Sequence, residues 1–302
     1  MFLIPRRRQL FRRAFHRGRG CGSEWIHPLL SCAAVIVTTI NVNGVRAAVR
    51  ERSEDNRGLL AWLTATAADV VCLQETRADD AQLADALAPA LQDGWHLASA
   101  EPHLRGRSGV AILSRAPFES VRIGLAATEF TNHGRYLEID LPGGATVGSL
   151  YVHSGEAGTD RQVEKERFMA ALAVRMAELA ADGRHAVLCG DWNIAHTEHD
   201  IKNWKGNLKK AGFLPNERHW LTELMESGWV DVVRRLHPDR PGPYSWWSWR
   251  GKAFDNDAGW RIDYHLATEA LAGRARAARV ERPEAYALRW SDHAPVTVEF
   301  DD

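Results

Sequence analysis

Short runs rich in β-branched residues alternate with longer amphipathic or alanine-rich stretches from residue 34 to the end of the chain. This alternation, with no internal repeat and no low-complexity linker, predicts one continuous α/β domain over residues 34–302. The expected helices cover residues 58–67, 80–88, 161–181 and 215–227. The expected strands cover residues 35–41, 69–75, 110–114, 136–141, 146–152, 186–191, 261–267 and 295–300.

The connections between these strands are of two kinds. Some are hairpin-length turns, such as Pro142-Gly143-Gly144, whereas others contain a helix. Because only antiparallel neighbours can be joined by a tight turn, the mixture predicts mixed sheets. Two packed mixed β-sheets flanked by helices would bury this many strands, so we expect a four-layer α/β sandwich.

Polar side chains gather where the expected strands end. The first strand runs into Asn41-Val42-Asn43, whose two carboxamides face the same side of an extended backbone. The second ends in Gln74-Glu75, and a carboxylate at the end of a buried strand needs a partner. The strand at 186–191 ends in Asp191-Trp192-Asn193. Two further polar segments follow, Trp260-Arg261-Ile262-Asp263 and Ser291-Asp292-His293.

Each segment taken alone also has an ordinary structural explanation. Asn43-Gly44 fits a tight turn, Glu75 a surface ion pair, Asp191 a helix N-cap and His293 a loop imidazole. Together, however, the segments supply the oxygen ligands that Mg²⁺ or Mn²⁺ prefers and an aspartate-supported histidine for proton transfer or phosphate binding. The combination indicates a hydrolase that uses a hard cation.

The same segments, in this order, resemble the exonuclease III and abasic-endonuclease family of the endonuclease/exonuclease/phosphatase (DNase I-like) superfamily. The resemblance spans residues 35–302 and is specific because all of its pieces occur with suitable spacing. The pieces are Asn41-Val42-Asn43-Gly44-Val45-Arg46, Leu73-Gln74-Glu75-Thr76-Arg77, Gly148-Ser149-Leu150-Tyr151, Gly190-Asp191-Trp192-Asn193-Ile194, Trp260-Arg261-Ile262-Asp263-Tyr264 and Ser291-Asp292-His293.

The resemblance implies a role for each of these polar residues. It makes Glu75 the principal Mg²⁺ ligand, with Mn²⁺ as a substitute, and Asp191 the residue that activates the attacking water or binds a second metal. Asn41, Asn43 and Asp292 would be further metal ligands. Tyr151 and Asn193 would contact the scissile phosphate, and Asn193, like Asp191, is also a candidate metal ligand. His293, oriented by Asp263, would contact the phosphate or transfer a proton. Some relatives carry aspartate at position 43, so the number of bound metals stays open.

Two segments are candidates for contact with double-stranded DNA that contains abasic sites or 3′ ends. The loop at 200–210 holds four lysines and one acid, and the resemblance implies backbone contacts from Lys205 and Asn207. The tryptophan-rich segment Tyr244-Ser245-Trp246-Trp247-Ser248-Trp249-Arg250 is followed by Trp260. The resemblance implies that Trp246 and Trp260 line a pocket for a flipped-out abasic sugar, with Arg250 as a wedge.

The first 33 residues differ from the rest, with seven arginines against the single acid Glu24 and no apolar periodicity. We expect a disordered basic extension or a start codon assigned too far upstream. An export signal is disfavoured, because Glu24, His27 and Pro28 interrupt any apolar stretch of the length that export needs. Of the chain's 38 Lys and Arg and 39 Asp and Glu, the remainder keeps 31 and 38, so it is not a generally basic DNA binder. DNA contact then depends on local basic patches and bound metal.

Cysteine usage favours a reducing cytoplasm, and hydropathy argues against a membrane partner. We also expect a monomer. The four cysteines form no metal-binding spacing, and Cys72 and Cys189 lie inside apolar runs as expected for buried free thiols. No run approaches the length of a membrane span.

Two alternatives to the DNA-repair phosphodiesterase remain. A superfamily phosphatase or sphingomyelinase acting on a small or lipid phosphoester would share the catalytic core, but the lysine loop and tryptophan cluster count against it. A DNA-binding protein with a decayed site is disfavoured because every expected catalytic residue is present. The loop after Tyr151 carries His153 where several relatives have proline, and the balance of abasic-site incision against 3′ to 5′ exonuclease action stays open.

Overall fold

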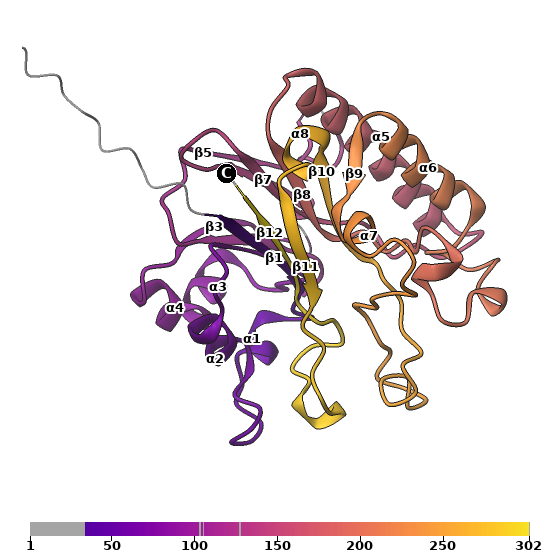
Figure 1. Ribbon diagram of the computed structural model, residues 1–302. Coiled ribbons are helices and arrows are strands. Elements are labelled where there is room, and N and C mark those ends of the chain that lie inside the picture. The colour runs from indigo at the N-terminus through magenta and orange to yellow at the C-terminus, as the bar shows by residue number, and fades with distance from the viewer. Residues whose placement is uncertain (1–33, 103, 105, 127, 302) are drawn as a thin grey trace, which may run out of the picture. The chain divides into compact units, whose positions relative to one another are not determined.

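A computed structural model describes residues 34–102, 104, 106–126 and 128–301. The expected basic extension at 1–33 lies outside the described residues. Within them lie two six-stranded sheets flanked by helices, so the predicted four-layer α/β sandwich is confirmed (Figure 1). No helix among these residues is long and apolar enough to cross a membrane.

The first sheet has the strand order β11-β12-β1-β2-β4-β3 and the second the order β5-β6-β7-β8-β10-β9. The pairs β1–β2 and β7–β8 are parallel and the other pairs antiparallel, as the mixture of connections predicts. The strands are β1 (Val35–Asn41), β2 (Val70–Gln74), β3 (His96–Ala100), β4 (Val110–Ser114), β5 (Ser120–Ile123), β6 (Tyr136–Asp140), β7 (Thr146–Tyr151), β8 (Ala186–Asp191), β9 (Trp229–Asp231), β10 (Asp263–Thr268), β11 (Ala275–Val280) and β12 (Val296–Phe300).

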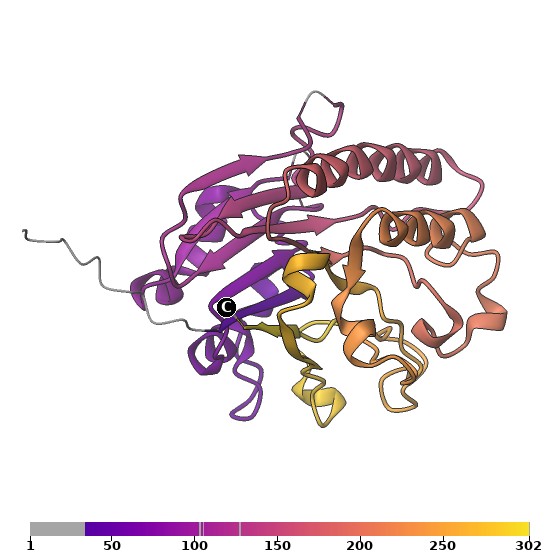
Figure 2. The ribbon, with the colours of Figure 1, turned by 45° about the horizontal axis from the view of Figure 1, so that its top comes forward.

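The helices α1–α4 cover the outer face of the first sheet and α5 and α6 that of the second, whereas α7 and α8 pack on the core between the sheets (Figures 1 and 2). Longer helices are α2 (Gly58–Ala65), α3 (Asp80–Ala86), α5 (Asp160–Ala181) and α6 (Pro215–Glu226). Shorter ones are α1 (Val45–Ala48), α4 (Ala88–Gln92), α7 (Val232–Leu236) and α8 (Glu269–Ala272), with 3₁₀ turns at Glu198–Asp200, Trp204–Gly206 and Tyr286–Leu288. All four expected helices and all eight expected strands occur, with bounds shifted by a few residues.

Three apolar layers hold the sandwich together. Between the sheets, side chains such as Val70 and Ile112 of the first sheet meet Leu137 and Val187 of the second. The outer face of the first sheet packs on α1–α4, and that of the second packs on α5 and α6 through residues such as Phe168. Since the central strands are covered on both faces, they consist mostly of apolar residues, and buried polar side chains within them, such as Thr38 and Ser149, are hydrogen-bonded inside the fold.

Candidate active site

The polar residues that end the central strands meet at one edge of the sandwich. Asn41 closes β1 opposite Gln74 of the parallel strand β2, so Glu75 follows directly beside it. In the second sheet, Tyr151 of β7 pairs in register with Asp191 of β8. The antiparallel strand β10 starts at this edge, and its first residue, Asp263, lies opposite Asp191. The two packed sheets therefore present their catalytic candidates toward each other.

Backbone geometry at the strand ends directs these side chains. Asn43, Glu75 and Asn193 all have positive φ, at 50°, 49° and 52°. Asparagine tolerates this left-handed conformation, whereas for glutamate it costs of order 1 kcal/mol or more. The turn is held by hydrogen bonds from Gly44 N to Glu75 O at 2.7 Å and from Val45 N to Thr76 O at 3.0 Å. Asn43 and Gly44 form a bend with positive φ at both residues, and this bend is part of the site.

Carboxylates and carboxamides of both sheets are joined at this edge. The Nδ2 of Asn41 donates to Glu75 Oε1 and to Asp191 Oδ2, both at 2.9 Å. Asn43 Nδ2 donates to Asp292 Oδ1 at 2.8 Å. Glu75 is also ion-paired with Arg77, so the surface-pair explanation holds in part. Several buried or half-buried carboxylates around few cations make an oxygen-rich, electronegative site that suits a hard divalent ion.

A buried acid and histidine form the second part of the site. His293 Nδ1 lies 2.9 Å from Asp263 Oδ2, and its Nε2 lies 3.7 Å from Asp191 Oδ2. Asp191 accepts hydrogen bonds from the backbone N and side-chain Nδ2 of Asn193, at 2.9 and 3.2 Å. Asp191 caps no helix, since residues 192–197 are irregular and a 3₁₀ turn begins at Glu198.

The protonation of this pair follows from its surroundings. Burial raises the pKa of Asp191 to about 7, with Asp263 and Glu75 adding to the rise and His293 opposing it. Burial works against a charged His293, but the carboxylates of Asp263 and Asp191 outweigh it and raise the pKa of His293 to about 10. The excess negative charge felt by Asp191 is what a bound cation would neutralise, so the donor set fits a divalent metal.

Tyr151 stands between the two parts of the site. Burial together with the charges of Glu75 and Asp191 raises the pKa of Tyr151 well above its usual range. The phenol therefore stays protonated and acts as a hydrogen-bond donor. The guanidinium of Arg135 lies 4.7 Å from the centre of the Tyr151 ring and holds it from behind.

A cavity of about 470 Å³ collects most of the residues expected from the sequence. Trp246 and Trp260 form one wall, with ring centres 6.1 Å apart and planes at 88°. Trp246 Nε1 also donates to Asp292 Oδ2 at 3.1 Å. The cavity is lined as well by Asn43, Glu75, Tyr151, Asp191, Asn193, Asp292 and His293, while Asn41 and Asp263 hydrogen-bond to this lining from behind.

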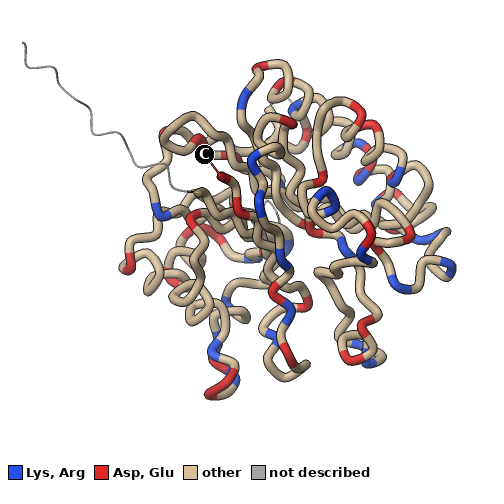
Figure 3. The backbone as a smooth tube through the Cα atoms, viewed as in Figure 1, with Lys and Arg blue, Asp and Glu red and all other residues tan. Residues whose placement is uncertain are grey.

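The other DNA-contact candidates, Lys205, Asn207 and Arg250, are not among the cavity's lining residues. Lys205 is exposed with its ammonium 5.5 Å from the Trp204 ring, and Asn207 Nδ2 donates to Asn203 O at 2.9 Å, which stabilises the loop itself. Arg250 is exposed in the loop after the tryptophan cluster. Figure 3 shows that lysine and arginine are distributed over several loops of the molecule.

Two buried residues that hydrogen-bond to site residues, Ser245 and Lys165, were not predicted from the sequence. Ser245 is buried and its Oγ donates to the same Asp263 oxygen that His293 contacts. Lys165 of α5 is fully buried, with Nζ 2.6 Å from Glu217 Oε1 and 2.9 Å from the carbonyl oxygen of Asn193. A lysine on the apolar face of the expected helix was the available signal, because a buried ammonium requires a charged partner.

Comparison with known proteins agrees with this geometry. The family model for the Endonuclease/Exonuclease/phosphatase family matches residues 38–293. An exodeoxyribonuclease of Bacillus subtilis is 34% identical over 85% of this chain and 95% of its own length. The DNA repair nuclease APEX1 of Danio rerio is 33% identical over 87% and 81%. An AP endonuclease from Archaeoglobus fulgidus superposes with a TM-score of 0.80 at 26% identity, covering 89% of this chain and 100% of its own.

A four-layer sandwich with paired carboxylates and an aspartate-bound histidine at its edge defines the protein as a phosphodiesterase of the nuclease class. The chain belongs to the Endonuclease/Exonuclease/phosphatase family, and its relatives are DNA-repair exodeoxyribonucleases and AP endonucleases. Nucleases of this family depend on a metal ion.

Proposed function

We propose that this protein uses Mg²⁺ to cut DNA on the 5′ side of abasic sites and to trim 3′ ends, with Mn²⁺ as a substitute. The observation that carries the proposal is the single cavity that joins Glu75, Asp191 and His293 to the wall formed by Trp246 and Trp260. The first three residues are equipped for phosphodiester hydrolysis. The apolar rings of Trp246 and Trp260 suit a sugar without a base more than they suit a free phosphate.

The ion would be held mainly by Glu75, with Asn41, Asn43 and Asp292 beside it. Asp191 and Asn193 are the candidates for a second ion. A bound divalent cation supplies electrostatic stabilisation of the negative charge that develops on the phosphate. Glu75 and Asp292 keep oxygen atoms within hydrogen-bonding distance of the asparagine side chains, so the carboxamides orient the carboxylates.

Asp191 is the candidate base for the attacking water. Its carboxylate is fixed by Asn41 and Asn193, and its raised pKa matches the range in which a general base is effective. Such a base contributes about 10² to 10⁴ in rate. The Asp191 side chain is also buried beside Tyr151 of the neighbouring parallel strand β7, which restricts its orientation.

His293, Tyr151 and Asn193 are the candidate contacts for the phosphate. Since His293 is held charged by Asp263 and Tyr151 stays protonated, both present hydrogen-bond donors to the cavity. Donors that are fixed before the reaction stabilise the developing charge without reorganisation. The Nδ2 of Asn193 donates to Val152 O at 2.9 Å, which holds its side chain at the cavity wall.

Substrate contact outside the cavity would come from Lys205, Asn207 and Arg250, with Trp246 and Trp260 enclosing the flipped-out sugar. We further propose that the protein works as a monomer in the cytoplasm. One chain supplies the complete candidate site, and Cys72 and Cys189 are buried free thiols, as a reducing compartment favours.

Nicking of plasmid DNA with abasic sites, with and without EDTA, tests this function directly. We expect incision that requires the metal, and no comparable release of phosphate from an inositol phosphate run in parallel. Preferential hydrolysis of the small phosphoester would favour a superfamily phosphatase instead. DNA binding without any metal-dependent cleavage would indicate a decayed site.

A further inference from the structure

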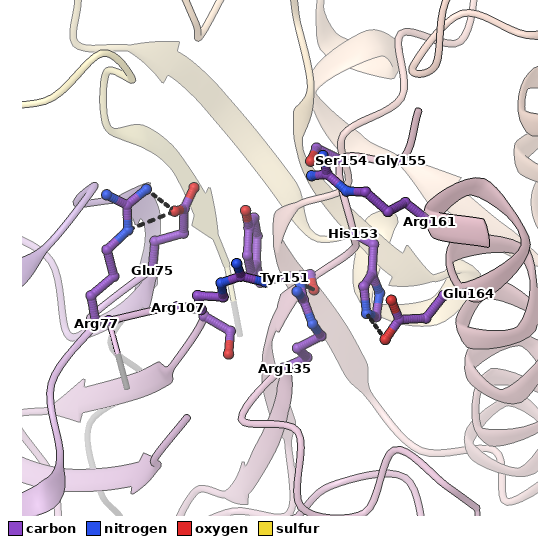
Figure 4. A pocket seen from close by; sticks show the side chains of 12 residues that line it. Glu75, Arg77, Arg107, Arg135, Tyr151, His153, Ser154, Gly155, Arg161 and Glu164 are labelled. Carbon is purple, nitrogen blue, oxygen red and sulfur yellow. Dashed lines mark hydrogen bonds and ion pairs between the residues drawn. The ribbon is translucent and has the colours of Figure 1, made fainter. Parts of the chain in front are cut away.

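A group of side chains with ligand atoms suited to a metal ion lies beside the candidate active site. The ligand atoms of His133, His153 and Glu164 all lie within 4.8 Å of one another. His133 comes from the loop before β6, His153 from the loop after β7 and Glu164 from α5. Figure 4 shows the His153 ring turned toward the Glu164 carboxylate, with Nε2 and Oε1 3.2 Å apart.

This group is separate from the residues that line the catalytic cavity. His153 and Glu164 border a neighbouring cavity of about 480 Å³, which shares Glu75 and Tyr151 with the catalytic one (Figure 4). His153 is only 6% exposed, and its Nδ1 has no hydrogen-bond partner among the described residues. The other ring nitrogen, Nε2, faces the Glu164 carboxylate, so a buried imidazole, a carboxylate and a second imidazole meet at one point.

We propose that His133, His153 and Glu164 form a binding site for a divalent transition ion of the zinc class. Two imidazoles and one carboxylate are a donor set that zinc takes in sites with an open fourth position. The cavity beside the ligands leaves room for water or a phosphate oxygen at that position. The ring of His153 is held in place by edge contacts with Phe130 and Phe168, with centres 5.9 and 5.3 Å away.

The ligand atoms of His133, His153 and Glu164 would have to move slightly closer together to bind one ion. Tetrahedral ligands at about 2.1 Å from zinc are roughly 3.4 Å apart, which the contact between His153 and Glu164 already matches. The wider separations in the group, up to 4.8 Å, would contract by about an ångström. His153 and Glu164 are fixed by packing and by α5, so closure requires a shift of the loop before β6, in which the His133 ring packs on Phe130 with ring centres 5.2 Å apart.

Nearby positive charge sets which ion the site accepts. Arg135 and Arg161 line the same cavity and repel any cation bound there. A hard ion such as Mg²⁺, which gains little from imidazole, would not overcome this repulsion, whereas strong nitrogen bonds to zinc would. The site would therefore discriminate against the ion proposed for catalysis.

Binding would also affect the neighbouring catalytic residue. Arg135 follows His133 by two residues, donates to Tyr151 O at 3.2 Å and stacks on the Tyr151 ring. An ion that joined His133 to α5 would restrict the segment that carries Arg135. This consequence rests on the proposed function of Tyr151, but the binding site itself does not.

Cobalt and zinc titration of metal-free, tag-free full-length protein tests the site without measuring activity. Co²⁺ gives a visible absorption band when four-coordinate, and Zn²⁺ affinity is obtained by competition with a chromophoric chelator. We expect one such Co²⁺ site in the wild type and in Glu75→Gln. His153→Ala and Glu164→Gln should each lose the band and bind Zn²⁺ at least about tenfold more weakly.

Matched controls separate this site from other histidines. His219 and Glu223 form an exposed pair 3.5 Å apart on α6, so His219→Ala should leave the Zn²⁺ affinity unchanged. Millimolar Mg²⁺ should not displace the Co²⁺ band. Because the Glu164 side chain is 38% exposed, Glu164→Gln should fold normally and remains informative if His153→Ala does not. Wild-type affinity in Glu164→Gln, or loss of the band in Glu75→Gln, would overturn the proposal.

Discussion

His293 Nε2 lies 3.7 Å from Asp191 Oδ2, across the join between the two sheets. At this separation the pair is too far apart for a direct hydrogen bond but near enough for strong electrostatic coupling. A phosphate oxygen or a water held near both groups would contact a base and a charged donor together.

The single substitutions Asp191→Asn and His293→Ala are each expected to abolish turnover while abasic-DNA binding stays largely intact. The reason is that each residue is assigned to the reaction and not to substrate affinity. Single-turnover cleavage and equilibrium binding to a labelled abasic duplex measure the two quantities. A near-normal single-turnover rate in either variant would remove that residue from the chemistry.

Glu75→Gln is expected to lower activity severely at limiting Mg²⁺ and to recover partly at high Mg²⁺ or with Mn²⁺. The substitution keeps the side chain's shape but removes the charge that would hold the ion. Activity measured across a Mg²⁺ titration is the test, with Glu223→Gln, an exposed residue of α6, as the control. An unchanged titration curve would exclude Glu75 from the metal site.

Asp200→Asn is expected to destabilise the fold by about 3 to 5 kcal/mol near neutral pH. Asp200 is fully buried, 2.6 Å from Arg261 Nε and 2.5 Å from Arg234 Nη2, so the substitution takes a carboxylate from both guanidinium groups and leaves the buried Arg261 with Asp231 alone. The measurement is urea unfolding of both proteins. Asp182→Asn, which removes an exposed pair with Arg184, should change stability by less than about 1 kcal/mol.

The effect of Asp200 should depend on pH in one direction. Burial opposes the charge, but Arg261 and Arg234 outweigh it and hold the pKa of Asp200 well below its usual value of 3.8. A pKa lowered by folding contributes stability that is complete above the unfolded value and is lost as the pH falls below it. The stability difference between wild type and Asp200→Asn should therefore shrink below about pH 4. A constant difference down to pH 3 would contradict the assignment.

Replacing Trp246 and Trp260 together with alanine should weaken abasic-site incision more than the trimming of a frayed 3′ end. The double variant removes a wall and a stacking surface, and aromatic stacking on nucleic acid contributes about 1 to 3 kcal/mol per contact. The ratio of the two activities is the observable. A normal incision rate, or equal loss of both activities with an altered circular dichroism spectrum, would leave the pocket assignment without support.

Deletion of residues 1–33 should leave folding and catalysis intact, because every predicted strand and site residue lies after this segment. At most, the salt dependence of DNA binding should become weaker, since seven arginines are removed. Solubility, thermal unfolding and incision rate at two salt concentrations are the measurements. Loss of soluble, active protein would show that the segment is more than an extension.

The sequence by itself determined the central strands and the residues that follow them. Central strands are covered on both faces, so β1, β2, β4, β7 and β8 are short, mostly apolar and β-branched runs that stand out in the sequence. Four strands nearer the sheet edges were not predicted: β3, β5, β9 and β11. β5 alternates half-buried and exposed residues and β11 interleaves alanine with arginine, so their pairing partners, and not their own composition, make them strands.

Only the tertiary structure decided how the candidate residues are coupled. The contact from Trp246 to Asp292 joins residues 46 positions apart, and that from Asn41 to Asp191 joins residues 150 positions apart. Sequence spacing carries no information on such contacts, because they depend on the register of strands in two different sheets and on how those sheets pack. Likewise, His153 and Glu164 are near in the chain, but His133 joins them only because β6 pairs with β7 and returns its loop to α5.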